Sequence, residues 1–173
     1  MKIILLTVIC FIQILADNAV AQTPDWFIAE INRLEGTWLA DNSEYISEQE
    51  TDDTYGLEWK KGTGGNSLLG ELFGMKDGIK TGSYWQFFQY WDPAENKVIV
   101  TQVSPWGTVG KGSLIMETDT KSKLDQLFTN PDGSSYRSGH ITESFDGYEV
   151  GSSYNINDSG EWEIQRTYKW VKQ

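Results

Sequence analysis

Cysteine and histidine are almost absent from this sequence, which contains one of each, Cys10 and His140. Cys10 lies in an apolar N-terminal run, so a chain that loses this run has no thiol. The absence of a thiol excludes thiol catalysis, disulfide exchange and cysteine–metal sites for such a chain. Secreted eukaryotic domains of this size more often carry disulfides, so their absence favours a bacterial protein that is periplasmic or secreted.

Positive charge is also scarce. The 14 lysines and arginines face 25 aspartates and glutamates, which gives a formal net charge of −11. A surface this acidic repels nucleic acid and anionic lipid. Nucleic-acid binding is therefore excluded as a function class.

Long apolar runs are limited to residues 3–16, which follow a basic start and precede a small-x-small pattern at 19–21. A membrane span needs about 20 apolar residues, more than this run provides. The pattern predicts a signal peptide at 1–21 and a single mature domain at 22–173. Cys10 lies inside the run rather than after it, so neither a lipid anchor nor another stable membrane anchor is expected.

Helical signals are confined to residues 24–34. Thr23 is placed to cap the helix, and Pro24 suits its first position. Phe27, Ile31 and Leu34 follow at helical spacing and form one apolar face. The sequence predicts a single short N-terminal helix.

After this helix the sequence alternates between apolar and polar residues, with turn residues at short intervals. The pattern predicts strands at 36–47, 54–61, 66–76, 79–91, 97–104, 107–118, 122–129, 134–145, 148–156 and 161–171. One open sheet rarely holds so many strands. The expected fold is therefore all-β, an antiparallel up-and-down β-barrel of about eight to ten strands.

One hairpin predicts which side chains face inward. A two-residue turn at Asp146-Gly147 pairs Phe145 with Tyr148 on one face. Stepping by twos from this pair leads to the inward set Arg137, Ile141, Glu143, Val150 and Tyr154. The last strand alternates strongly, and its predicted inward set is Trp162, Ile164, Arg166, Tyr168 and Trp170.

The helix leading into Gly36-Thr37-Trp38 resembles the start of the first strand in lipocalins and other calycins. In that family a Gly-x-Trp lies just inside the first strand, and a basic residue of the last strand packs across the indole. The resemblance implies Gly36, Trp38 and Arg166 as a structural signature, with Lys169 as the second choice for the basic residue.

Two further stretches are similar to secreted bacterial lipocalin-like domains of unknown function. They are 90–112, rich in aromatic residues and glycine, and 166–170, an aromatic–basic ending. The resemblance covers the mature chain and implies a fold but no activity. Haem-binding barrels of this group use a histidine in a late strand, and His140 lies in another strand, so haem is not implied.

Aromatic side chains are abundant, with 8 tryptophans, 8 tyrosines and 7 phenylalanines. They either fill the barrel as core or line a cavity for a small ligand. Both faces of strand 79–91 are aromatic, so the sequence leaves open which of two sets points inward: a tryptophan set, Trp85, Phe87 and Trp91, or a tyrosine set, Tyr84, Phe88 and Tyr90. Trp59 is a further candidate for the wall, and Trp106 for a position at the mouth.

Three charged residues, Arg137, Glu143 and Arg166, are expected to point inward, where an unpaired charge is unfavourable. They form either an internal ion-pair network or an anchor for an acidic ligand. His140 is expected on a polar, solvent-facing strand face between Ser138 and Thr142. No spacing predicts a metal site or a cofactor.

Three functions remain open. The first is an exported barrel that binds a small hydrophobic or amphipathic molecule in its interior. The second is a barrel enzyme that uses Glu143 and Tyr154 as acid–base groups on a lipid-like or aromatic substrate. The third is a packed barrel that acts through a surface partner.

Overall fold

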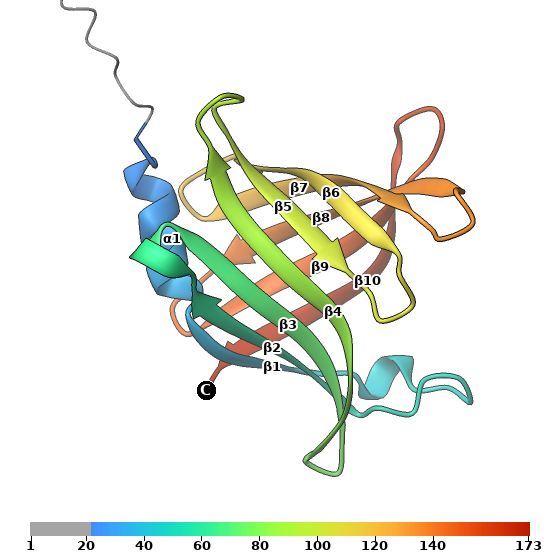
Figure 1. Ribbon diagram of the computed structural model, residues 1–173. Helices are drawn as coiled ribbons and strands as arrows, with labels where there is room; N and C mark the ends of the chain where they lie inside the picture. Colours follow the sequence, from blue (N-terminus) through green and yellow to red (C-terminus); the bar gives the residue numbers. More distant parts are fainter. Residues whose placement is uncertain (1–21) are drawn as a thin grey trace, which may run out of the picture.

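The computed structural model describes residues 22–173, which form a closed antiparallel barrel of ten strands with one short helix at its N-terminal end (Figure 1). The predicted signal peptide, 1–21, lies outside the described residues. Helix α1 spans Asp25–Leu34. The strands are β1 Gly36–Asp41, β2 Thr54–Lys61, β3 Ser67–Lys76, β4 Ile79–Asp92, β5 Lys97–Val103, β6 Val109–Met116, β7 Lys121–Thr129, β8 Ser135–Ser144, β9 Tyr148–Ile156 and β10 Trp162–Lys172. The expected all-β up-and-down barrel is confirmed.

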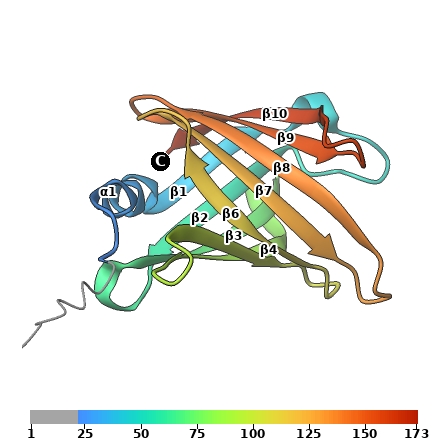
Figure 2. The same cartoon turned by 90° about the horizontal axis from the view of Figure 1, so that it is seen from above.

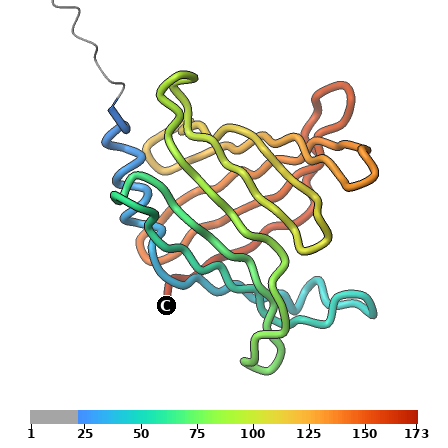
Figure 3. The backbone as a smooth tube through the Cα atoms, in the orientation of Figure 1, coloured from blue at the N-terminus to red at the C-terminus, as the bar shows by residue number. Residues whose placement is uncertain are grey.

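Each strand pairs with its neighbours in the chain, and β1 pairs with β10 to close the cylinder. The path of the backbone around the barrel can be followed in Figure 3. The closing seam is the shortest ladder, with two residue pairs, Trp38 with Lys172 and Leu39 with Val171. The Gln173 amide adds a bond of 2.9 Å to the Thr37 carbonyl oxygen. Closure therefore depends on contacts beyond the ladder itself.

Helix α1 supplies those contacts by covering one end of the barrel (Figure 2). Its apolar face, Phe27, Ile31 and Leu34, is buried as predicted. Pro24 is the N-cap residue and no side chain caps the helix, so the expected cap by Thr23 does not form. The buried core around this end also includes Ala40, Trp59, Leu68, Val98, Val100, Leu114 and Trp170.

Trp38 joins the helix to the seam. Its indole N–H donates to the Leu34 carbonyl oxygen at 2.8 Å. The Arg33 guanidinium and the Lys172 ammonium lie 5.6 and 5.4 Å from its ring, within cation–π range. The basic residue beside the indole is therefore Lys172, and the expectation of Arg166, or of Lys169 as second choice, is wrong. Arg166 lies farther from this end of β10 and pairs with Glu50, and Lys169 lies over Tyr148.

The first strand is shorter than predicted and ends at Asp41. The Asp41 carboxylate accepts a bond of 2.8 Å from the Ser43 amide, which turns the chain into a 3₁₀ helix at Ser43–Tyr45. We call residues 42–53, which run from this turn to β2, the strap. In Figure 1 the strap lies at the end of the barrel opposite α1.

Irregularities in two strands, β10 and β4, determine which of their side chains face the interior. In β10 the register shifts between Ile164 and Arg166, so Arg166, Tyr168 and Trp170 face the interior while Trp162 and Ile164 face outward. In β4 a shift opposite Leu72 and Phe73 leaves Tyr84 unpaired beside Trp85. A bulge reverses the alternation of every residue beyond it. The inward prediction for Trp162 and Ile164 is therefore wrong.

Candidate functional site

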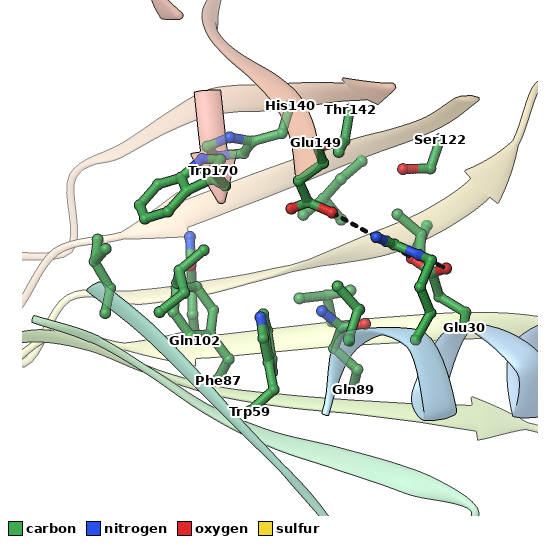
Figure 4. Close-up of a pocket in the computed structure, with 17 residues that line it drawn as sticks. Glu30, Trp59, Phe87, Gln89, Gln102, Ser122, His140, Thr142, Glu149 and Trp170 are labelled. Atoms are coloured by element: carbon green, nitrogen blue, oxygen red, sulfur yellow. Dashed lines mark hydrogen bonds and ion pairs between the residues drawn. The ribbon is translucent and has the colours of Figure 1, made fainter. Parts of the chain in front are cut away.

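The interior of the barrel contains a cavity of about 180 Å³ next to helix α1 (Figure 4). Aromatic and aliphatic side chains form most of its wall, including Trp59 from β2, Phe87 from β4, Leu124 from β7 and Trp170 from β10. The Trp59 and Phe87 rings lie 5.3 Å apart. We call this space the inner cavity.

The Trp59 ring lies flat against the wall because its neighbour has no side chain. A Cβ on Gly70 would lie 2.2 Å from that ring. Gly110 gives the same clearance to Phe128, with 2.5 Å to the nearest ring atom. Glycines that face large rings across a ladder thus leave volume free inside the barrel.

An ion-paired cluster closes the helix end of the inner cavity. The Arg33 guanidinium donates to Glu30 at 2.7 and 2.8 Å and to Glu149 at 2.9 Å. Figure 4 shows Glu149 reaching from β9 toward the helix, where a dashed line joins it to this guanidinium. Burial raises the pKa of Glu149 above its usual range, although Arg33 opposes that shift. The cluster contains two carboxylates and one guanidinium.

Uncharged amides line the middle of the barrel. Gln89 from β4 and Gln102 from β5 both border the inner cavity and are buried. The Gln102 amide donates to Gln126 Oε1 at 3.3 Å. Gln89 Oε1 and Gln126 Nε2 are buried without a hydrogen-bond partner among residues 22–173. Such unpaired buried polar atoms are uncommon in native proteins.

His140 also borders the inner cavity, where burial lowers the pKa of its imidazole to about 4. The imidazole is therefore neutral at neutral pH, with one nitrogen as donor and the other as acceptor. The expectation that His140 faces solvent is wrong. The turn at Asp146-Gly147 has the predicted geometry, because the Phe145 amide donates to the Tyr148 carbonyl oxygen at 2.9 Å. The polar face of β8 is nevertheless the one that faces the interior.

Toward the strap the interior widens into a second space of about 370 Å³, which we call the vestibule. Leu72, His140 and Trp170 line both spaces, so the two are adjacent sections of one lumen. Tyrosines dominate the vestibule: Tyr55 lies 5.7 Å from Tyr84 and 5.9 Å from Tyr168, between ring centroids.

A bidentate ion pair holds the strap over the vestibule. The two terminal nitrogens of Arg166 each lie 2.6 Å from an oxygen of Glu50. Glu50 also accepts from the Tyr55 hydroxyl at 2.7 Å and from the Asn42 amide at 3.0 Å. These bonds lower the pKa of Glu50 to about 2, and the hydrogen bond from Arg166 has the largest effect. Arg166 is thus already paired within the chain.

A second contact of the strap involves Asp52. Its carboxylate accepts hydrogen bonds from the Tyr84 hydroxyl and from the Thr81 hydroxyl, the latter at 2.8 Å. The hydrogen bond to Asp52 is the main cause that raises the pKa of Tyr84 to about 12. The strap therefore contacts both β4 and β10.

Of the residues predicted for a binding site, four lie in the lumen. Trp59 and Phe87 border the inner cavity, and Trp85 and Arg166 border the vestibule. The open choice in β4 is resolved in favour of the tryptophan set for most of the strand, because Phe88 and Tyr90 stack on each other outside and Phe88 is exposed. Tyr84 is the exception, because it lies at the register shift and lines the vestibule together with Trp85. Trp106 is 68% exposed and lies 6.4 Å from Tyr84, at the rim of the vestibule.

The other three residues lie outside the barrel. Arg137 forms an exposed ion pair with Asp125. Glu143 is exposed and stands opposite Lys121 in the β7–β8 ladder. Tyr154 packs against Trp162, with ring centroids 5.4 Å apart. The inward expectation for these residues is wrong, so Arg137 does not anchor a ligand in the lumen, and Glu143 and Tyr154 do not form an acid–base pair there.

Several lumen residues were not predicted, namely Gln89, Gln102, Glu149 and the interior position of His140. A sequence signal exists for one of them, because Gln89 lies between Phe87 and Trp91 on an otherwise aromatic face. Within residues 22–173, no group of three or more histidine, aspartate or glutamate side chains is arranged to hold a metal ion. In the same part of the chain, no helix is long and apolar enough to cross a membrane.

No protein-family model matches the chain, and no curated protein sequence matches it.

Proposed function

We propose that this chain is an exported lipocalin-like barrel that binds a small hydrophobic or amphipathic molecule in its lumen without transforming it. The observation that carries the proposal is the inner cavity, a volume of about 180 Å³ walled by aromatic side chains and bordered by a buried amide with an unpaired oxygen. A barrel that serves only as a packed scaffold has no need of such a space, because interiors normally pack to high density.

The size of the inner cavity favours a small ligand. Engineered apolar cavities of about 150 Å³ bind benzene, so the space beside Trp59 and Phe87 suits one six-membered ring. A longer molecule would extend into the vestibule, between Tyr55 and Tyr168. Ligand sites of this kind are mostly apolar with a few fixed polar groups, as this lumen is.

Native mass spectrometry of mature protein from its own host, followed by denaturing extraction, tests the proposal. We expect a co-purifying small molecule in the native spectrum that is released on denaturation. An empty protein that also fails to bind hydrophobic fluorescent probes would contradict the proposal.

A pair of leucines on β7 provides matched variants for the same test. Leu124 borders the inner cavity, whereas Leu127 is exposed on the outer face of the same strand. Leu124→Trp places an indole in the cavity and should abolish binding of the molecule found by extraction. Leu127→Trp adds the same group outside and should leave binding unchanged. Equal binding by both variants would place the ligand elsewhere.

The export part of the proposal rests on residues 1–21, whose sequence pattern is that of a signal peptide. We expect the intact mass of protein from the periplasm or the medium to match a chain whose first residue is Gln22. A mass that includes Met1 in the purified protein would contradict removal of this segment.

A further inference from the structure

The only guanidinium at the inner cavity, among the described residues that line it, is already paired, and carboxylates outnumber it. Arg33 is shared between Glu30 and Glu149, so two carboxylates meet one guanidinium. At the vestibule, both terminal nitrogens of Arg166 are occupied by Glu50. A carboxylate ligand would therefore meet no unpaired cation among residues 22–173 that line these two spaces, and it would approach Glu149 at the inner end.

The groups that remain available to a ligand are uncharged. Gln89 is 8% exposed, borders the inner cavity and has an unpaired Oε1 that accepts hydrogen bonds. His140 faces the same space as a neutral imidazole, which has one donor and one acceptor nitrogen. Thr142 adds a hydroxyl from the same face of β8. The cavity thus presents uncharged donors and acceptors in addition to its ion-paired cluster.

The walls around these groups are aromatic. Trp59, Phe87 and Trp170 contribute rings to the inner cavity, which can contact a planar ligand on its face or edge. A planar molecule with one ring would fill the volume, and its polar substituent would reach the amide or the imidazole. Hydrocarbons would leave Gln89 Oε1 unpaired, which is unfavourable for a buried acceptor.

We infer that the inner cavity selects an uncharged planar ligand with an amide-type donor and acceptor, of the aromatic carboxamide or lactam class, over carboxylates and hydrocarbons of the same size. This inference rests on the proposed function, because it names the ligand class for the same lumen. It differs from the acid-binding alternative raised by the sequence, in which Arg137 or Arg166 would have held a carboxylate.

Three single-ring probes of similar size test the inference: benzamide, benzoate and toluene, each titrated at neutral pH with isothermal calorimetry. We expect benzamide to bind about tenfold more tightly than the other two, because a site built for hydrogen bonds rejects analogues that leave them unmade. Benzoate or toluene binding as tightly as benzamide would overturn the inference.

Two glutamines of β4 supply the variants. Gln89 faces the cavity, whereas Gln86 is exposed on the outer face of the same strand. Gln89→Leu should lower benzamide affinity about tenfold and leave toluene affinity unchanged or higher. Gln86→Leu should change neither affinity. A Gln89→Leu protein that folds, as judged by its near-ultraviolet circular dichroism, and still prefers benzamide would overturn the role of Gln89.

The two levels of proposal fail differently. If toluene binds and benzamide binds no better, the lumen takes ligands but the inference about their class is wrong. If none of the three probes binds and the native protein carries no small molecule, the proposed function itself is wrong.

Discussion

Arg33 on helix α1 donates to Glu149 on β9 at 2.9 Å, and this contact ties the helix to the wall that it covers. Glu149 is 7% exposed, so its charge depends on this partner. The pair therefore stabilises both the fold of the N-terminal end and the closed end of the lumen.

Arg33→Leu should reduce the free energy of unfolding by about 2–3 kcal/mol, slightly below the range for fully buried pairs because Arg33 is partly exposed. The pKa of Glu149 is already raised, so its protonated form favours the folded state. The stability that comes from protonation of Glu149 is present below the usual carboxyl pKa and is lost as pH rises through the raised value. Above that value the buried carboxylate is charged and depends on Arg33 as its partner. Urea denaturation should therefore show a larger loss at pH 8 than at pH 5, and Glu149→Gln in the same chain should restore most of it. An equal loss at both pH values would contradict this account.

His140 should make stability fall with acidification. Its pKa is lowered from 6.5 to about 4 in the folded state, so only the unfolded chain takes up the proton as pH falls below 6.5. The expected loss is about 2 kcal/mol between pH 7 and pH 5. His140→Gln should flatten the stability profile in this interval, above the range in which most carboxylates titrate. A variant with the same slope as the original protein would show that another group is responsible.

Arg166 should control the order of the strap. Arg166→Met removes both bonds to Glu50, and we expect a loss of about 1 kcal/mol because the pair is partly exposed. Hydrogen exchange should become faster in residues 42–53. Since the pKa of Glu50 is lowered to about 2, the stability that this pair contributes is present above pH 4.5 and decreases as pH falls toward 2.

The matched control for this variant is Arg137→Met, which breaks the exposed ion pair with Asp125 on the outer face. Exposed pairs of this kind are worth little, so we expect a change within about 0.5 kcal/mol and no effect on the strap. If the Arg137 variant accelerates exchange in the strap as much as the Arg166 variant, the effect is global and not local.

Gly139 should tolerate no side chain. A Cβ there would lie 2.3 Å from the Trp162 ring and 2.9 Å from the Leu124 carbonyl oxygen. Gly139→Ala should therefore cost about 1–3 kcal/mol in thermal or urea denaturation. Gly82 in β4 has open space at the same position, and Gly82→Ala should be neutral or slightly stabilising. Equal stability of the two variants would contradict the packing of Trp162 on β8.

The sequence predicted the strands well because turns and alternation are local signals. Asp77 and Gly78, for example, both have positive φ and form the two-residue turn between β3 and β4. The apolar face of helix α1 was readable for the same reason, since its spacing is fixed by helical geometry. The closed topology followed from the number of short-linked strands.

The faces of β8 and β9 could not be predicted because polarity no longer separates inside from outside. Ser138 and His140 face a lumen that, although mostly apolar, also contains polar side chains, while Tyr154 covers the outer surface together with Trp162. A rule that places apolar side chains inward therefore assigned these strands the wrong way round. The same inversion explains why Arg137 and Glu143, predicted to point inward, lie on the outer face.

The bulge in β10 was a second limit. Nothing in the alternating run from Trp162 to Trp170 marks the register shift near Gln165, although it reverses the first two positions of that run. The strap was missed because its course depends on distant partners, such as the bond from the Tyr168 hydroxyl to Asn42 Oδ1 at 2.7 Å. Such contacts have no local pattern in the sequence.

The short seam between β1 and β10 has a consequence for the order of folding. Its partners, Trp38 and Lys172, come from opposite ends of the described chain, so the cylinder cannot close until the last strand has been synthesised. Pairings between distant segments are slow to form, and until then β1 presents an unpaired edge. The lumen that the ligand is proposed to occupy therefore does not exist as an enclosed space until β10 has paired with β1.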